Sequence, residues 1–354
     1  MAFLEFKNVR ISGLSAGVPR RKICNLDLQS VSSDYDSAAF VETTGVLERR
    51  VDSITTSDLC LSAAEQLIKD LQWEKDSIEA IIFVSQSTDY LLPATACIVQ
   101  DKLGLSRECY AEDIVLGCSG WVYGLSSLAA LMCQGSIKRA LLMAGDAKRR
   151  VEYDDPLFGF AGTVTALEYE EGASGFQFHF GTDGSGYDAI IVPDGGSRNG
   201  ITSRSFEEET IDGKKYTRLQ SRMKGMDVFA FGISTAPKSV KKLGEHFGFD
   251  YLDSDYFVFH QANMKMNGMI AKKLKLPTEK VPSCMRYFGN TSSASIPLTI
   301  VTQLKEACKE TKQFICCGFG VGLSWGTVRF KTDTIIISDL VEVDRDLELE
   351  SKYV

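Results

Sequence analysis

Cys118 lies where a catalytic nucleophile often lies in α/β proteins. The segment Asp113-Ile-Val-Leu-Gly ends an expected strand, and Ser119-Gly120 begins a helix of small residues. Because the positive end of a helix dipole stabilises a thiolate, this position predicts a lowered pKa for the Cys118 thiol. Cys118 is therefore a candidate nucleophile. The alternative is a packed cysteine at the start of a helix, since thiols often serve as small buried apolar groups.

His260 and Asn290 are candidates for the polar groups that would act beside such a nucleophile. His260 directly follows the expected strand Tyr256–Phe259. A histidine at the carboxyl end of a strand in an α/β fold points into the usual ligand crevice, although a histidine that caps a helix would give the same pattern. Asn290 begins a Gly-Asn-Thr-Ser turn before a long expected helix. Its amide could donate to a substrate, or it could simply cap that helix.

A glycine-rich segment, Gly318-Phe-Gly-Val-Gly322-Leu-Ser-Trp-Gly326, follows these residues between two expected strands. Its exposed backbone N–H groups could stabilise an oxyanion, and a plain turn is the alternative. Cys118, His260 and Asn290 therefore occur in that order, each at a strand end or in a turn near a helix start.

The pattern of elements predicts how these residues are positioned. In the first half, short apolar runs at Ala80–Val84, Asp113–Leu116, Arg139–Gly145, Val164–Tyr169 and Ala189–Val192 accompany helical patterns at Ser57–Leu71 and Ser119–Gln134. This order favours a largely parallel sheet covered by helices. The second half repeats the theme, with helices at Met226–Leu243, Lys265–Leu276 and Ser295–Glu310 and strands at Tyr256–Phe259, Gln313–Cys317 and Leu323–Phe330.

The two similar halves predict a duplicated α/β domain, with an N-terminal half over residues 1–175 and a C-terminal half over 176–354. Residues 195–215 are polar and contain glycine, so we expect an excursion or linker there. Residues 339–354 are acidic and are expected to form a solvated edge or a frayed tail.

Composition excludes several classes of protein. The 354 residues include 39 Lys and Arg and 47 Asp and Glu, so the net charge of −8 argues against nucleic-acid binding. No apolar run approaches the roughly 18 residues that span a membrane, and the start does not read as a secretory signal. The ten cysteines form no CxxC pair and the chain has three histidines, which disfavours a zinc site. We expect reduced thiols and a cytoplasmic protein.

Together these motifs resemble β-ketoacyl-acyl-carrier-protein synthase III, a family of thiolase-fold condensing enzymes. The matching segments are Cys118-Ser119-Gly120, His260-Gln261-Ala262-Asn263, Gly289 to Ser292 with Ala294 to Pro297, and Gly320 to Gly326. The resemblance runs from about residue 5 to residue 331. It implies an α/β, thiolase-like duplicated fold with five-layered α-β-α-β-α architecture, and a homodimer.

The resemblance also implies a reaction and the residues that perform it. Cys118 would take an acyl group from acyl-coenzyme A or an acyl carrier protein, and malonyl-carrier protein would lose carbon dioxide to give an enolate. His260 and Asn290 would each donate a hydrogen bond to the enolate oxygen. The backbone N–H groups of Cys118 and Gly322 would form the oxyanion hole of the acyl intermediate. No metal or other cofactor is implied.

Substrate and partner contacts follow from the same resemblance. The acyl pocket is predicted to include Leu92, Phe160, Met226 and Phe229, with Leu92 reaching the pocket of the partner subunit. The acidic acyl carrier protein is predicted to dock on Lys265, Lys272 and Lys273, near three further cations, Arg218, Arg222 and Lys224. A solvated lysine-rich surface is the alternative for this set.

The sequence departs from the family where the nucleotide of coenzyme A is usually held. Ala39 and Thr43 stand at the places of the usual Trp and Arg, Met226 replaces an Asn, and Lys265 replaces an Arg. A carrier-bound or unusual acyl donor is therefore as well supported as acetyl-coenzyme A. Three alternatives stay open: acyl transfer from Cys118 to an alcohol or amine, joining of two acyl thioesters without decarboxylation, and a silent partner that sets chain length.

Overall fold

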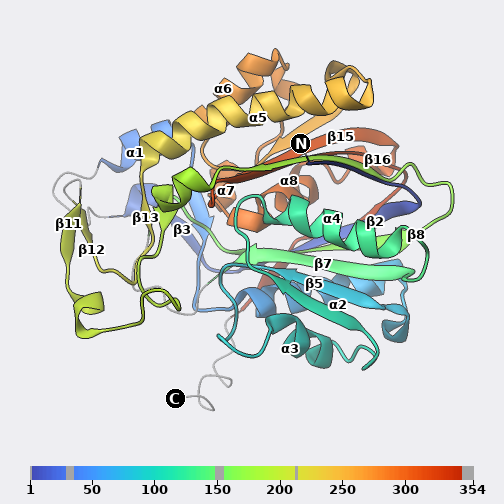
Figure 1. Cartoon of the computed structure of the whole chain (residues 1–354), viewed down its shortest axis with the longest axis horizontal. Coiled ribbons are helices and arrows are strands. Elements are labelled where there is room, and N and C mark those ends of the chain that lie inside the picture. The colour runs from blue at the N-terminus through green and yellow to red at the C-terminus, as the bar shows by residue number, and fades with distance from the viewer. Residues whose placement is uncertain (1, 29–35, 148–154, 212–213, 345–354) are drawn as a thin grey trace.

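Two β-sheets alternate with three layers of helices (Figure 1). The computed structural model describes residues 2–28, 36–147, 155–211 and 214–344. The first sheet has the strand order β17 (Ile336–Ile337), β2 (Val9–Pro19), β8 (Ala161–Tyr169), β7 (Arg139–Asp146), β5 (Ala80–Val84) and β6 (Tyr110–Ile114), with β18 (Val341–Val343) also paired to β2. The second has the order β1 (Ala2–Phe6), β9 (Phe176–Thr182), β16 (Ser324–Thr332), β15 (Lys312–Gly320) and β14 (Tyr256–Phe259).

Both sheets are mixed. In the first, which was predicted to be largely parallel, four of the six described strand pairs are parallel, whereas in the second only one of four is. β5 runs parallel to β6 and β7, but β8 is antiparallel to β7 and β2. In the second sheet β14 and β15 are parallel, whereas β15 and β16 are antiparallel. The three-residue loop 321–323 joins β15 to β16, and so short a connection permits only antiparallel neighbours.

The helices lie in three layers, which confirms the predicted α-β-α-β-α architecture. In the central layer, α4 (Gly120–Met132) and α8 (Ser295–Gln303) contact both sheets. The first sheet is covered by α2 (Thr56–Leu71) and α3 (Thr95–Lys102), and the second by α5 (Gly225–Phe247) and α6 (Met264–Leu274). Two short helices, α1 (Ser37–Thr44) and α7 (Met285–Phe288), complete the set of α-helices in the described ranges. None of the described helices is long and apolar enough to cross a membrane.

α4 is apolar on most of its circumference because it is packed between two sheets. Gly124 lets it approach the first sheet, since a Cβ there would lie 2.6 Å from Leu142 Cδ1. The buried Trp121 donates its indole N–H to Thr165 Oγ1 over 3.0 Å. These contacts fix the helix that follows Cys118.

The chain ends exchange between the two halves. β1, at the N-terminus, joins the second sheet, and β17 and β18, near the C-terminus, join the first. The predicted boundary at 175/176 coincides with the start of β9, but each half includes a strand from the other end of the chain.

The acidic C-terminal segment includes β18, a half-exposed strand that pairs only with β2, which agrees with the predicted solvated edge. In β18 the Glu342 carboxylate lies 2.8 Å from the buried Arg50 guanidinium and also pairs with Arg20. Residues 345–354 of the predicted tail lie outside the described residues.

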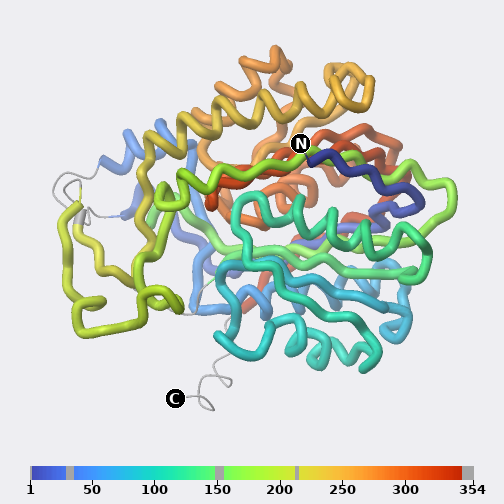
Figure 2. Tube along the Cα trace, in the orientation of Figure 1, coloured from blue at the N-terminus to red at the C-terminus, as the bar shows by residue number. Residues whose placement is uncertain are grey.

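Three other elements differ from prediction. α8 ends at Gln303 rather than Glu310. The predicted strand 189–192 is the two-residue β10 (Ile190–Ile191), which pairs with β13 (Arg222–Met223) outside both main sheets. The excursion predicted at 195–215 contains a small hairpin of β11 (Glu209–Ile211) and β12 (Lys214–Tyr216), which projects from the side of the molecule (Figure 2). A further pair, β3 (Lys22–Cys24) and β4 (Glu48–Arg50), lies apart from the main sheets.

Candidate active site

Cys118 lies in the turn between β6 and α4, two residues before the helix begins. The turn is pressed against β15 of the second sheet. A Cβ at Gly320 would lie 2.6 Å from Cys118 Sγ, and one at Gly318 would lie 2.8 Å from the Cys118 carbonyl oxygen. The glycines of this segment therefore allow a close approach of two backbones, a role that the sequence did not distinguish from a plain turn.

The Cys118 thiol does not have the predicted low pKa. Burial raises the pKa to about 11, and Asp146 acts in the same direction. Hydrogen bonds with the Val321 backbone and the Ser292 side chain lower it in part. The N-terminus of α4 also favours the thiolate, but its dipole acts against the larger cost of removing a charge from water. At physiological pH the resting Cys118 side chain is therefore the neutral thiol.

His260 immediately follows β14, as predicted, and its ring is 1% exposed. Its backbone N–H donates to the Cys317 carbonyl over 2.9 Å, and its ring meets Phe319 edge to face with centroids 5.7 Å apart. Nδ1 lies 2.8 Å from Ser295 Oγ. Burial lowers the pKa of His260 to about 4, so the imidazole is neutral at physiological pH.

Asn290 lies in the turn between α7 and α8, and its backbone is paired on both sides. Its N–H donates to the Leu157 carbonyl, and its carbonyl accepts from the Gly159 N–H. The side-chain Oδ1 accepts from the Ser292 N–H over 2.9 Å. This contact orients the amide so that its NH₂ group is left to donate. Asn290 does not cap α8, whose N-cap is Ala294 without a side-chain cap bond.

Ser292 brings the three predicted residues together. Its side chain hydrogen-bonds the Cys118 thiol, its N–H holds the Asn290 amide, and its backbone hydrogen-bonds the His260 ring. The φ angle of Ser292 is +52°, in the left-handed region that serine seldom adopts. The surrounding contacts hold this conformation, as is common at functional sites. The sequence offered Ser292 only as one member of a motif.

Of the predicted oxyanion-hole and pocket residues, Gly322 and Phe229 lie nearest the candidate site. Gly322 lies in the loop 321–323, next to the Val321 backbone that contacts the thiol. Phe229 packs against a hydrophobic cluster that includes Phe259 and Phe319. The ring of Phe319 contacts His260. These two residues therefore lie close to the candidate site.

The other three pocket residues do not join that cluster. Phe160 packs against a separate group formed by Ile54, Leu59 and Ala147. Leu92 is 86% exposed and Met226 is 81% exposed on this single chain. Leu92 thus points away from its own molecule, and Met226 lies in the exposed first turn of α5.

Sequence reasoning missed Arg49, which is fully buried. Its Nε donates to Asn25 Oδ1 over 2.9 Å, and its Nη1 lies 3.3 Å from the Phe158 carbonyl. Phe158 forms a bridge with Asn290, so Arg49 supports the segment that carries the Asn290 backbone. Arg49 stands next to Arg50 in Glu-Arg-Arg, and no sequence signal showed which of the two supports the site.

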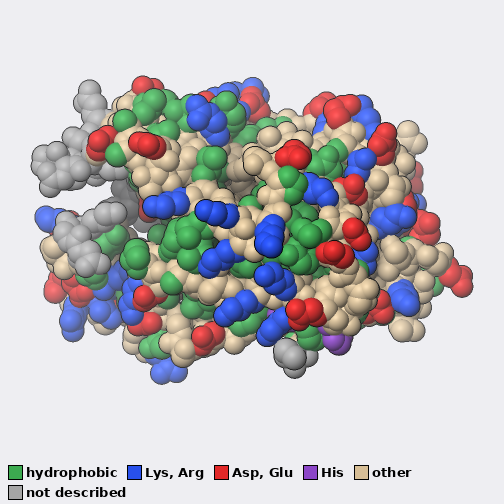
Figure 3. Space-filling model, turned by 90° about the horizontal axis from the view of Figure 1, so that it is seen from above, with side chains coloured by type: hydrophobic (Ala, Val, Ile, Leu, Met, Phe, Trp, Pro, Cys, Tyr) green, Lys and Arg blue, Asp and Glu red, His purple; other side chains and the backbone are tan. Residues whose placement is uncertain are grey.

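The predicted docking lysines are exposed on α6. Figure 3 looks down on α5 and α6 and shows Lys and Arg side chains gathered along this face. Lys273 has a structural contact, because its Nζ donates over 2.9 Å to the Ile233 carbonyl of α5. Pro237 has no N–H to offer that carbonyl, so the lysine replaces the missing helical bond.

The three further cations near the docking lysines are already paired. Arg218 makes two hydrogen bonds to Asp194, Arg222 pairs with Glu209, and Lys224 pairs with Asp188. Among the described residues, neither the Lys265 nor the Lys272 side chain has a hydrogen bond or an ion pair.

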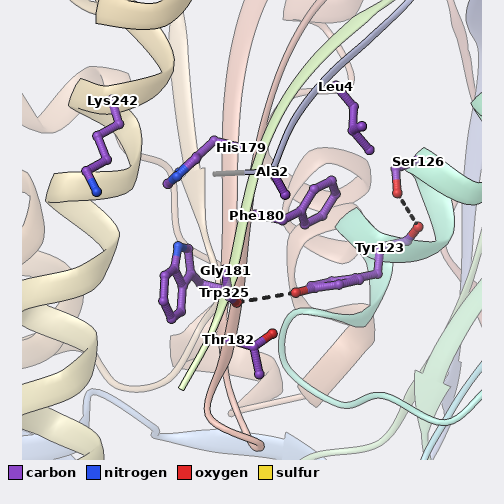
Figure 4. A pocket seen from close by; sticks show the side chains of 10 residues that line it. All are labelled: Ala2, Leu4, Tyr123, Ser126, His179, Phe180, Gly181, Thr182, Lys242 and Trp325. Carbon is purple, nitrogen blue, oxygen red and sulfur yellow. Dashed lines mark hydrogen bonds between the residues drawn. The ribbon is translucent and has the colours of Figure 1, made fainter. Parts of the chain in front are cut away.

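An open hollow of about 590 Å³ lies at the C-terminal end of β9 (Figure 4). Its lining comes from five elements and comprises Ala2, Leu4, Tyr123, Ser126, His179, Phe180, Gly181, Thr182, Lys242 and Trp325. The lining includes none of the three candidate catalytic residues. His179 is turned toward the α5 side of β9, and Phe180 toward the α4 side.

The raised pKa of Cys118 predicts how alkylation of this thiol depends on pH. Only the thiolate reacts, so the rate of Cys118 alkylation by iodoacetamide should keep rising tenfold per pH unit up to at least pH 9. Peptide mass spectrometry after timed labelling measures this rate at Cys118. A rate that levels off below pH 8 would show that the helix dipole outweighs burial.

Known proteins match this chain along most of its length. Residues 112–184 match the model of the 3-oxoacyl-[acyl-carrier-protein (ACP)] synthase III family, and residues 245–332 match the model of its C-terminal region. A Clostridioides difficile protein named β-ketoacyl-[acyl-carrier-protein] synthase III is 33% identical over 326 residues, 89% of this chain and 96% of the relative. A protein of the same name from Syntrophomonas wolfei is 32% identical over 330 residues, 90% of this chain and 96% of the relative.

Solved structures give the same result. The crystal structure of a 3-oxoacyl-(acyl-carrier protein) synthase from Burkholderia xenovorans is 38% identical, with a TM-score of 0.87 over 97% of this chain and 99% of that one. A synthase III from Pseudomonas aeruginosa is 27% identical, with a TM-score of 0.79 over 93% of this chain and all of the other. Sequence and fold agree, and the chain belongs to the 3-oxoacyl-[acyl-carrier-protein] synthase III family.

Proposed function

We propose that this chain joins an acyl thioester to malonyl-acyl carrier protein by decarboxylative Claisen condensation, through an acyl-Cys118 intermediate. The observation that carries the proposal is the convergence of Cys118, His260 and Asn290 on Ser292. A partly exposed thiol nucleophile stands beside two buried, neutral hydrogen-bond donors. Membership of the 3-oxoacyl-[acyl-carrier-protein] synthase III family supports the same reaction.

In the first step the Cys118 sulfur attacks the carbonyl carbon of the acyl thioester. The carbonyl oxygen becomes an oxyanion, held by the backbone N–H groups of Cys118 and Gly322. The carbon–sulfur bond to the carrier then breaks, and the carrier thiolate takes the proton that Cys118 has lost. Because Cys118 rests as a thiol, its proton passes to the departing carrier thiolate and the site gains no net charge.

In the second step malonyl-carrier protein loses carbon dioxide, and the remaining electron pair forms an enolate. His260 and Asn290 each donate one hydrogen bond to the enolate oxygen. The enolate carbon attacks the acyl carbonyl, a carbon–carbon bond forms, and Cys118 leaves as a thiolate that regains a proton. These steps require no metal or redox group.

The low pKa of His260 favours condensation over acyl transfer to an alcohol or amine. A general base that activates an alcohol works best with a pKa near the operating pH. His260 has a pKa of about 4 and is a weak base, but its neutral ring can still donate a hydrogen bond. The side chain therefore suits the enolate step better than deprotonation of an acceptor.

Replacing His260 separates the two steps. We expect His260→Ala to form acyl-Cys118 at nearly the wild-type rate but to lower condensation about 100- to 1,000-fold, since only the enolate loses a donor. Intact-protein mass spectrometry measures the acyl adduct, and ¹⁴CO₂ release from carboxyl-labelled malonyl-carrier protein measures decarboxylation. The matched control is Cys118→Ala, which should form no adduct. Equal loss of both steps in His260→Ala would contradict the assigned roles.

We further propose that Lys265 and Lys272 bind the acidic carrier protein. Both side chains are exposed and unpaired on α6, whereas Arg218, Arg222 and Lys224 are neutralised by carboxylates. Complementary charge mainly increases the rate of encounter between partners. Lys273 has its own bond to α5 and is therefore excluded from the docking set.

The double variant Lys265→Glu/Lys272→Glu tests this docking site. We expect the KM for malonyl-carrier protein to rise about 10-fold at low salt with little change in kcat, because the chemical groups remain intact. The matched control, Lys273→Gln, should lower the melting temperature and leave the KM unchanged. A KM that rises in Lys273→Gln but not in the double variant would contradict docking on Lys265 and Lys272 and would place the carrier protein near Lys273.

We propose that the active form is a homodimer. β6 is the last strand of the first sheet, and its outer edge is unpaired among the described strands. Beside it, Leu91 is 94% exposed, and Leu92 and Val115 are also exposed. Such an edge is a template for pairing with a second copy about a two-fold axis.

Charges placed on this surface should break the dimer. The variant Leu91→Asp/Leu92→Asp is expected to sediment as a monomer at micromolar concentration, because its carboxylates would have to be buried. Analytical ultracentrifugation measures the change. The control is Ile201→Asp, a similarly exposed apolar position on the excursion. A wild-type protein that sediments as a monomer would contradict the proposal.

A further inference from the structure

The two ring nitrogens of His260 have different surroundings. Nδ1 is occupied, since it lies 2.8 Å from Ser295 Oγ. The ring also hydrogen-bonds the Ser292 backbone, and Nε2, on the other side of the ring from Ser295, is the nitrogen that we expect to meet a substrate. A neutral imidazole has one N–H, so it can donate to an enolate from Nε2 only if the proton is on Nε2 and Nδ1 is bare.

The bonds of Ser295 determine which nitrogen holds the proton. Ser295 is fully buried, and its Oγ already accepts a hydrogen bond from the Gln261 N–H over 3.3 Å. Its own O–H needs an acceptor, and in the described parts of the chain the only acceptor within reach is His260 Nδ1. If Nδ1 carried the proton instead, the Ser295 O–H would be buried without a partner, which is unfavourable.

We propose that Ser295 is a positioning residue that donates its hydroxyl proton to His260 Nδ1 and so holds the imidazole in the Nε2–H form needed for decarboxylation. This inference rests on the function proposed above. Ser295 touches neither the nucleophile nor the substrate and acts through His260 alone. It begins α8, whose central position between the sheets fixes the hydroxyl against the ring.

The role makes the two halves of the reaction respond differently. Acylation of Cys118 uses the backbone oxyanion hole and does not need the His260 proton. Decarboxylation needs it directly. Ser295→Ala should therefore lower decarboxylation about 10- to 100-fold, the usual effect of losing a group that orients a functional histidine, and leave acylation within about twofold. Ser295→Thr keeps the hydroxyl and should retain decarboxylation.

The chain contains a matched control for this hydrogen bond. His179 Nδ1 lies 2.7 Å from Ser239 Oγ, and both residues are buried in the second half of the molecule. Ser239→Ala removes the same type of hydroxyl–imidazole bond away from Cys118. It should affect stability and leave both half-reactions unchanged, so a general loss of packing can be told apart from a loss of the His260 proton.

The test is ¹⁵N NMR of histidine-labelled protein combined with the two half-reactions. The chain has three histidines, and the His260 signals are those absent in His260→Gln. Wild type should show a protonated Nε2 and a bare Nδ1 at His260, and Ser295→Ala should shift protons toward Nδ1. A wild-type His260 protonated at Nδ1 would overturn the inference even if Ser295→Ala failed to fold. So would a folded Ser295→Ala that decarboxylates at the wild-type rate.

The same experiment keeps the two proposals apart. If wild type shows the Nε2–H form but releases no carbon dioxide from any malonyl thioester, the proposed reaction fails and the purpose assigned to Ser295 fails with it. If wild type releases carbon dioxide and Ser295→Ala does so equally, the reaction stands and the inference alone is overturned.

Discussion

The site depends on the close contact between β15 and the turn that carries Cys118. At Gly320 a single methyl group would collide with the sulfur, and at Gly318 with the backbone of the same turn. The contact joins the second sheet to the start of α4, which is anchored on the first sheet through Trp121. The nucleophile therefore lies where both halves of the molecule meet. Catalytic groups from the two halves can reach it only because the backbones come this close.

The second requirement is that the polar groups around Cys118 are fixed and uncharged. The thiol and the imidazole are both held neutral by burial, with the thiol pKa raised and the imidazole pKa lowered. Ser292 and Ser295 bind these groups through specific hydrogen bonds. A site of this kind stabilises charge that appears during the reaction, because its donors are in place beforehand and carry no charge of their own to be solvated.

Much of the site was predictable because residue type and position were informative together. Cys118, His260 and Asn290 each follow a strand or precede a helix, and few other residues of the chain combine such chemistry with such places. The pKa of Cys118 was predicted in the wrong direction, since sequence shows the helix start but not the burial. Ser292, Ser295 and Arg49 were not identified, because their roles depend on the partner that each side chain meets.

The fold was predicted at the level of its layers and less well at its edges. Repeated strand and helix patterns indicated two similar halves, but the exchange of β1 with β17 and β18 depends on long-range pairing that local pattern does not encode. The acyl-pocket residues stay predictions. Phe160 packs in a separate cluster, and Leu92, expected to reach a partner subunit, lies exposed on this chain, because apolar type alone does not show which face of the fold a side chain occupies.

The most direct test of the central claim is to follow the wild-type acyl-Cys118 adduct through a full cycle. The protein is loaded from a panel of acyl-coenzyme A and acyl-carrier donors, and malonyl-carrier protein is added while intact mass and carbon dioxide are recorded together. The account predicts that the adduct on Cys118 disappears with one carbon dioxide released per acyl group lost. An adduct that clears only when an alcohol or amine is supplied, without carbon dioxide, would contradict it.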